Sequence, residues 1–272
     1  MQCRGFLLGG TAGRTTLAGE GLQHQDGHSH ILANTVPSCV SYDPAYAYEL
    51  AVIVQDGLRR MYHDGESIYY YLTVMNEKYP QPEMPEGVEN GILKGMYRVR
   101  EGQGGGPRVQ LLGSGTILRE VLAAAKMLEH DHGVSADVWS VTSFNELARD
   151  GQDVDRWNML HPGDESKMSF VERQLMGTTG PVIAATDYMR LYSEQIRAFV
   201  PNGRSYRTLG TDGWGRSDGR EKLRRFFEVY RNNVCVAALG SLAEEGAVDR
   251  DYVNRAIAKY GIEADLAAPR HR

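Results

Sequence analysis

Short apolar segments alternate with amphipathic segments over the second half of the chain. Residues 108–112 and 136–141 are apolar runs typical of strands, and between them apolar side chains recur at helical spacing over residues 116–129. The alternation continues with short helices expected in 143–160, strands in 181–186 and 206–210, and helices in 188–199, 218–229, 234–245 and 249–260. Strands separated by helices indicate a parallel sheet covered on both faces, so the pattern predicts an α/β fold.

The first third of the chain combines similar elements with a long polar segment. Strands are expected at 5–11, 36–42 and 68–74. A helix is expected from Pro44 to Tyr62, with Asp43 as its N-cap. Residues 12–34 are polar and rich in glycine and histidine, which indicates a loop. Because a buried strand with nothing before it is unusual in an intact domain, we expect the chain to start inside a domain.

Prolines and glycines concentrate between these two parts. Residues 79–107 hold four prolines and a glycine-rich run at 102–106. Such composition is typical of a boundary between domains. We therefore expect a first unit at 1–80, a linker at 81–107 with a short helix or strand around residues 91–99, and a second unit at 108–272.

Composition and charge argue against several classes of protein. The formal net charge is −5, whereas a chain that holds nucleic acid usually has a basic excess. No apolar run approaches the roughly 18 to 20 residues that a membrane helix needs. The three scattered cysteines, Cys3, Cys39 and Cys235, make neither a disulfide framework nor a zinc site. We therefore predict a cytoplasmic enzyme that binds no nucleic acid and no membrane.

The densest group of chemically active side chains lies between residues 19 and 30. This glycine-rich segment contains three histidines and two carboxylates: Glu20, His24, Asp26, His28 and His30. Histidine donates and accepts protons near neutral pH, so the pattern favours a catalytic or substrate-binding loop. The alternatives are a solvated surface loop and a metal site. Because no His-Glu-x-x-His order occurs, metal binding is disfavoured and no metal ligands are predicted.

This segment resembles the active-site loop of the homodimeric pyruvate dehydrogenase first components. The similarity covers Thr15-Thr16-Leu17-x-Gly19-Glu20-Gly21-Leu22-Gln23-His24-x-Asp26-Gly27-His28-Ser29-His30. The portion Asp26-Gly27-x-x-His30 is also similar to a loop of transketolases. Further matches extend over nearly the whole chain, at 41–49, 84–87, 111–115, 144–153, 156–162 and 209–218. One departure is Gln25, where many relatives carry an acid.

The resemblance implies a fold and an activity. Residues 1–80 would be the C-terminal half of a thiamine-enzyme pyrimidine-binding domain, and residues 108–272 a transketolase-type C-terminal domain with a central, mostly parallel sheet. Members of the family are homodimers that decarboxylate pyruvate oxidatively with thiamine diphosphate and Mg²⁺. They transfer the acetyl group to the lipoyl domain of the dihydrolipoamide acetyltransferase.

The resemblance also implies roles for individual residues. His24 would hydrogen-bond the covalent substrate intermediate, and Asp26, His28 and His30 would line the same pocket. Glu20 would lie near the cofactor. The reaction needs oriented donors around the pyruvate oxygen, which histidines can supply. The Gly-Asp-Gly motif and downstream asparagine that hold the Mg²⁺-diphosphate are not found, so the isolated chain is expected to be inactive.

Two other functions stay open at this point. One is a non-catalytic dimerisation or scaffold module, and the other is a transketolase-like transfer of ketol groups between sugars. Transketolases handle phosphorylated sugars and need basic contacts around the loop. The only arginine in residues 5–58 is Arg14, so pyruvate is the favoured substrate.

Overall fold

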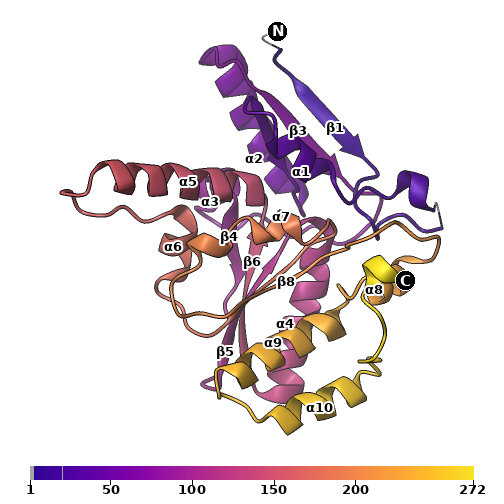
Figure 1. The fold of residues 1–272 in the computed structure, drawn as a ribbon. Coiled ribbons are helices and arrows are strands. Elements are labelled where there is room, and N and C mark those ends of the chain that lie inside the picture. Colours follow the sequence, from indigo (N-terminus) through magenta and orange to yellow (C-terminus); the bar gives the residue numbers. More distant parts are fainter. Residues whose placement is uncertain (1–2, 20) are drawn as a thin grey trace.

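The computed structural model describes residues 3–19 and 21–272 and contains two β-sheets that meet near the middle of the molecule (Figure 1). The smaller sheet has three parallel strands in the order β1-β3-β2: β1 (Phe6–Gly10), β2 (Cys39–Tyr42) and β3 (Tyr69–Val74). Helices α1 (Ser29–Asn34) and α2 (Ala47–Leu58) connect these strands, and a π-helical turn (Arg59–His63) extends α2. This sheet and α2 share a small apolar core around Ile53, Tyr70 and Leu72.

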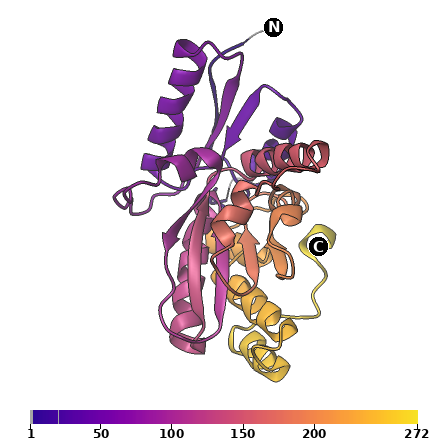
Figure 2. The same cartoon turned by 90° about the vertical axis from the view of Figure 1, so that its left-hand side faces the viewer.

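The larger sheet has five strands in the order β4-β6-β5-β7-β8. Strand β4 (Met96–Arg100) is antiparallel to β6 (Ser135–Val141). All other neighbouring pairs are parallel, and they involve β6, β5 (Arg108–Gly113), β7 (Val182–Ala185) and β8 (Tyr206–Leu209). Two groups of helices pack on its two faces (Figure 2), with α4 (Leu118–His132), α9 (Arg231–Glu244) and α10 (Arg250–Lys259) in one and α5 (Phe144–Leu160), α6 (Phe170–Leu175) and α7 (Leu191–Glu194) in the other. The remaining helical elements are α3 (Glu89–Lys94), α8 (Arg220–Phe226) and 3₁₀ turns at Leu22–His24, Gly115–Ile117, Arg197–Phe199 and Pro269–His271. Within the described part of the chain, no helix has both the length and the apolar character needed to cross a bilayer.

Alternate side chains of the central strands face two separate hydrophobic cores. In β5, Val109 and Leu111 pack with α4 and α9, whereas Leu112 packs with α5, α6 and α7. In β6, Val138 and Val141 divide between the two cores in the same way. Strands that are buried on both faces explain the continuous apolar runs in the sequence. The predicted α/β fold with a mostly parallel central sheet is thus confirmed.

Several elements differ from those expected. Residues 143–160 form one helix rather than several short ones, and Ser143 caps it by accepting the N–H of Glu146. The helix expected at 188–199 is divided into α7 and a separate 3₁₀ turn. The segment 12–34, expected as a loop, ends in helix α1. Irregular sequence therefore ends earlier than its composition indicated.

The expected N-cap at Asp43 is wrong. Helix α2 begins at Ala47 with Tyr46 as its N-cap, and the carboxylate of Glu49 accepts the N–H groups of Ala45 (2.5 Å) and Tyr46 (3.0 Å). The chain stays extended past Asp43, whose own N–H donates to a carbonyl at the end of β6 (2.7 Å). A contact with the larger sheet therefore replaces the expected cap.

The segment expected as a linker contains regular structure. Helix α3 and strand β4 both lie within residues 81–107, and β4 is the edge strand of the larger sheet. Ile92 and Tyr97 from these elements also pack into the core of the smaller sheet. Irregular structure is confined to residues 75–88 and 101–107. The short helix or strand expected around residues 91–99 is thus confirmed, as the end of α3 and most of β4, between two irregular segments rich in proline or glycine.

A buried carboxylate joins the two sheets. Glu49 of α2 is fully buried, and its Oε1 accepts hydrogen bonds from Tyr97 Oη on β4 (2.6 Å) and Ser140 Oγ on β6 (2.6 Å). Its Oε2 accepts the two backbone N–H groups at the start of α2. Burial raises the pKa of Glu49, while these four donors favour its ionised form. One side chain therefore satisfies donors from both units.

Replacement of Glu49 should destabilise the fold in a graded way. Glu49→Leu leaves four buried donors without an acceptor, and we expect it to lower the free energy of unfolding by about 3–5 kcal/mol. Glu49→Gln should lower the free energy of unfolding by less, because the hydroxyl groups of Tyr97 and Ser140 can turn to accept hydrogen bonds from the amide. Urea unfolding monitored by circular dichroism measures both losses, with the exposed Glu89→Gln as the control. Equal unfolding midpoints for all three variants would refute the proposed junction.

Candidate active site

The carboxyl ends of strands from both sheets meet at one place. Asp43 follows β2 and its N–H donates to Thr142 O after β6 (2.7 Å), while Ser114 after β5 donates its hydroxyl to Thr186 Oγ1 after β7 (2.9 Å). Ligands of open α/β sheets usually bind outside this edge of the strands. The segment 12–28, which carries most of the candidate residues, is held against this edge by the contacts described next.

Two buried side chains hold the beginning of this segment. Asp187, two residues after β7, accepts hydrogen bonds from the backbone N–H of Thr15 (3.1 Å) and from its hydroxyl (2.7 Å). Arg14 is almost completely buried and donates from Nη1 to Thr211 O (2.8 Å) and to Gly213 O. The first residues of the segment are thus fixed by the second unit.

A side-chain amide holds the middle of the segment next to His24. Gln25 is buried, and its Nε2 donates to the carbonyl of Arg216 (2.5 Å) while its Oε1 accepts the N–H of the same residue (2.7 Å). Such a two-way contact needs a group that donates and accepts at once, which an amide provides and an ionised carboxylate does not. Gln25 therefore anchors the loop to the segment after β8.

The fold separates the predicted site residues into an exposed and a buried group. His24 and His28 are exposed. Asp26 is partly buried, and its Oδ1 accepts the N–H of His28 (2.9 Å) and of the next residue (3.0 Å), the first of α1. His30 is completely buried. Glu20, the predicted cofactor-binding residue, lies outside the described residues.

His30 lies inside an aromatic cage. Its ring contacts those of Tyr71, Tyr188 and Tyr192, at centroid distances of 5.4, 4.6 and 4.8 Å. Its Nε2 lies 3.1 Å from Thr73 Oγ1. Burial lowers the pKa of His30 to about 3, so the ring is neutral at physiological pH. In this arrangement His30 supports the loop from beneath instead of facing the exposed histidines.

Two buried acids at the site were not singled out from the sequence. The pKa of Asp43 is raised to about 7, mainly by burial and in addition by the neighbouring Asp187. The hydrogen bond that Thr73 Oγ1 donates to Asp43 Oδ1 (2.7 Å) acts in the opposite direction. Burial likewise raises the pKa of Asp187 to about 6, opposed by its hydrogen bonds from Thr15. Each acid closely follows a predicted strand at the carboxyl edge of its sheet. That position is the signal that could have identified them.

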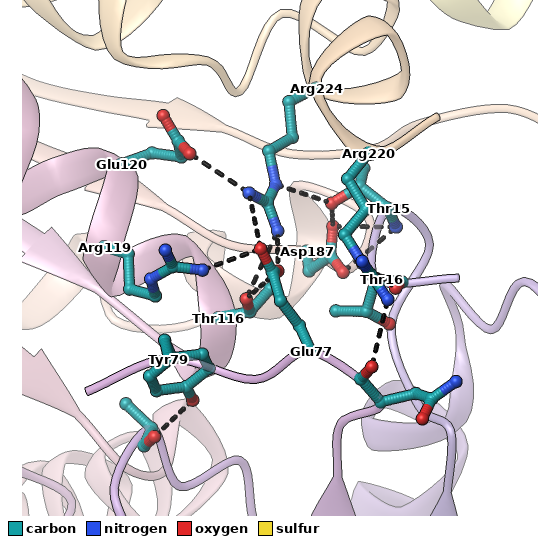
Figure 3. A network of polar contacts seen from close by, with 12 residues as sticks. Thr15, Thr16, Glu77, Tyr79, Thr116, Arg119, Glu120, Asp187, Arg220 and Arg224 are labelled. Atoms are coloured by element: carbon teal, nitrogen blue, oxygen red, sulfur yellow. Dashed lines mark hydrogen bonds and ion pairs between the residues drawn. The ribbon is translucent and has the colours of Figure 1, made fainter. Parts of the chain in front are cut away.

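A charged network lies beside the segment and joins it to three other parts of the chain (Figure 3). Arg224 of α8 donates to Glu77, to Glu120 of α4 (3.1 Å) and to Thr15 Oγ1 (3.3 Å). Arg119 also donates to Glu77 (2.6 Å). Because Arg224 is buried and satisfied by two carboxylates, its charge is compensated inside the protein. The network therefore adds a second contact from the second unit to Thr15, beside that of Asp187.

The buried Asp43 should make stability depend on pH. A carboxyl group whose folded-state pKa (about 7) exceeds its ordinary value (3.8) stabilises the fold below pH 3.8, and this contribution is lost as the pH rises through 7. Asp43→Asn removes the titration. Its stability relative to the native chain should therefore rise between about pH 4 and about pH 8, by up to about 4 kcal/mol. Urea unfolding across this range measures the difference, with the exposed Asp153→Asn as control; a pH-independent difference would exclude a raised pKa.

The amide of Gln25 should be irreplaceable by an ionised acid. Gln25→Glu loses the donor to Arg216 O, and we expect the loop contact to weaken by about 1–3 kcal/mol near neutral pH. The loss should shrink at low pH, where a protonated acid can again donate and accept. Hydrogen–deuterium exchange of residues 21–28 and of the Arg216 amide reports the contact, and the exposed neighbour Gln23→Glu is the matched control. Unchanged exchange in the Gln25 variant would show that the amide does not anchor the loop.

Comparison with known proteins places these residues in a family. The pyruvate dehydrogenase E1 component middle domain matches residues 1–82, and the transketolase-like TK C-terminal domain matches residues 95–230, which is half of the chain. A Pseudomonas aeruginosa protein named pyruvate dehydrogenase E1 component is 61% identical over 98% of this chain and 30% of its own length. Relatives of the same name from Cupriavidus necator and Escherichia coli (strain K12) are 60% and 57% identical, each over 99% of this chain and 30% of its own length. The chain thus spans less than a third of the length of these curated relatives.

Solved structures share the fold at much lower identity. A transketolase from Campylobacter jejuni has a TM-score of 0.61 and is 16% identical, with 86% of this chain and 31% of that chain covered. A split-gene transketolase, described as an inactive β4 tetramer, has a TM-score of 0.59 and is 18% identical, with 88% and 67% covered. The chain therefore belongs to the transketolase-like family, and it is similar to pyruvate dehydrogenase E1 components over nearly its whole length.

Proposed function

We propose that this chain supplies the substrate-facing loop of a pyruvate dehydrogenase (acetyl-transferring). The observation that carries the proposal is the segment 21–28, which lies where the two sheets meet. It exposes His24 and His28, while Gln25 and Asp26 beside them are held by hydrogen bonds. A relative 61% identical to the chain carries the name of this enzyme component. In the complete enzyme, thiamine diphosphate would accept the electron pair left when carbon dioxide departs.

The protein's own task in such a reaction is to hold oxygen atoms in place. Decarboxylation needs little from the protein at the leaving carboxylate, but charge changes on the remaining oxygen must be met by oriented donors. His24 and His28 are the candidate donors, because both rings reach the surface of the loop. Asp26 and His30 would act indirectly, Asp26 by holding the backbone before α1 and His30 by supporting the loop from the core. Glu20 is proposed to lie near the cofactor.

The residues of this chain do not fit the Mg²⁺-diphosphate end of the cofactor. Among residues 3–19 and 21–272, no three His, Cys, Asp or Glu side chains gather as a metal site would require. We therefore expect the ligands of Mg²⁺ and of the diphosphate to come from the parts of the relatives that this chain does not match. The 272-residue chain alone would then be inactive.

The proposal extends to partners and location. By analogy with the family resemblance, the complete enzyme would be a cytoplasmic homodimer that passes its product to the lipoyl domain of the dihydrolipoamide acetyltransferase. A transketolase-like reaction is less well supported. Arg14, the single arginine in residues 5–58, is buried and already bonded to backbone carbonyls, so it cannot contact a sugar phosphate. Pyruvate, which carries no phosphate, needs no such contact.

The activity can be tested by restoring the missing length. A chimera joins this chain to the remaining part of the Pseudomonas aeruginosa relative, and release of labelled carbon dioxide from pyruvate is measured with thiamine diphosphate and Mg²⁺. We expect turnover with pyruvate and none with a ketose phosphate. His24→Ala should lower kcat by roughly 100-fold, since a donor to the reacting oxygen is lost, whereas the distant surface variant His63→Ala should not.

Three outcomes would contradict the proposal. A folded chimera that releases no carbon dioxide would favour a non-catalytic scaffold. Turnover of a ketose phosphate in place of pyruvate would favour transketolase-like transfer. Full activity of His24→Ala would remove His24 from the site.

A further inference from the structure

A buried arginine contacts one of the exposed histidines from below. Only 1% of the surface of Arg14 is exposed. Its Nη1 donates hydrogen bonds to Thr211 O and Gly213 O. Its Nη2 lies 3.3 Å from Nδ1 of His28. Arg14 thus connects the segment after β8 to the ring of a candidate site residue 14 positions further along the chain.

The position of this guanidinium is tightly constrained. A Cβ atom added to Gly27 would collide with three of its atoms, so glycine provides the space that Arg14 occupies. The carbonyl of Gly27 accepts the N–H of Met189 (2.9 Å), which fixes the backbone on that side. The ring of Phe227 packs 5.8 Å from the guanidinium carbon. Arg14 therefore has little freedom to withdraw from His28.

The chemistry of the contact determines which nitrogen of His28 carries the proton. An arginine side chain has only donors, so Nδ1 of His28 must be unprotonated to accept from Nη2. The neutral ring then carries its proton on Nε2. Other histidines of the chain have the opposite arrangement, since Nδ1 of His63 and His130 faces a carboxylate and Nδ1 of His161 faces a backbone carbonyl. Those three rings must donate from Nδ1 to make the contact.

We propose that Arg14 is a positioning residue that fixes His28 as the neutral tautomer protonated on Nε2, so that this N–H is available to a substrate oxygen. The use of the donor in catalysis rests on the proposed function, whereas the tautomer does not. His28 would then bind a carbonyl or carboxylate oxygen as a neutral donor. It would not supply the transferable proton that the sequence pattern suggested.

The surrounding charges support a neutral ring. Burial lowers the pKa of His28, and the cation of Arg14 lowers it further, while Asp26 and Asp212 act in the opposite direction. Protonation would place a proton on Nδ1 directly against the guanidinium, so it would break the contact as well as add charge. The donor on Nε2 is consequently kept through the neutral pH range.

Nuclear magnetic resonance of the chain with isotope-labelled histidine tests the tautomer directly. Two-bond proton–nitrogen correlations near neutral pH distinguish protonated from unprotonated ring nitrogens, and loss of one signal set in His28→Gln assigns the ring. We expect His28 to be unprotonated at Nδ1, and His63, His130 and His161 to be protonated there. Protonation of Nδ1 in His28 of the unaltered chain would overturn the proposal, whether or not any variant folds.

Variants of Arg14 test the cause of the tautomer. Arg14→Met removes the donor at similar length, and we expect the pKa of His28 to move upward towards the ordinary value of about 6.5 and both tautomers to be populated. Arg14→Lys keeps a cation and a donor, so it should restore part of the native behaviour. A folded Arg14→Met chain with unchanged pKa and tautomer of His28 would overturn the role of Arg14. Because none of these readouts uses catalysis, failure of the proposed function would appear separately, as an inactive chimera with the expected spectrum.

Discussion

Hydrogen bonds between buried polar groups, rather than apolar contacts, determine where the candidate loop lies. Between β1 and α1 the buried apolar side chains include only small or isolated ones such as Ala12 and Leu17, while Arg14, Thr15 and Gln25 are buried polar residues. A polar segment is stable in such a position only if its donors and acceptors find partners. The partners of Thr15 and Gln25 and the two carbonyls that accept from Arg14 Nη1 lie in the second unit, so the second unit largely sets the geometry of the loop.

This dependence explains what the sequence could and could not predict. The central strands were predicted because burial on both faces leaves a local mark, a run of apolar residues. The contacts that hold the loop leave no such mark. Thr15 and Asp187 are 172 positions apart, Gln25 and Arg216 are 191 apart, and no periodicity connects residues at that separation. The wrong prediction of Asp43 as an N-cap has the same origin. Aspartate suits a helix N-cap, but here the residue makes a contact between the two sheets.

The histidine cluster shows a related limit. Three histidines within seven residues indicate where a site is, but not which of them belong to its surface. Helix α1 begins at Ser29, and from there the chain turns His30 into the aromatic cage while His28 stays outside. A one-dimensional pattern cannot distinguish these cases, because the start of α1 is set by Asp26 and by packing against the core. The roles of these residues therefore stay a prediction. His24 and His28 have the geometry to contact a substrate, and His30 does not.

The interior of the site holds less charge than the sequence suggests. His30 is neutral, and the raised pKa of Asp43, about 7, leaves this acid partly protonated near neutral pH. Arg14 keeps its charge, but it is compensated by nearby acids and bonded to backbone carbonyls. Isolated ions are costly in a region of low dielectric, whereas fixed neutral donors are not. For a reaction in which charge appears only briefly on a substrate oxygen, a rigid neutral donor favours the transition state without binding the ground state too strongly. The buried Arg14 therefore contributes both to the polar support of the loop and to the neutral state of His28.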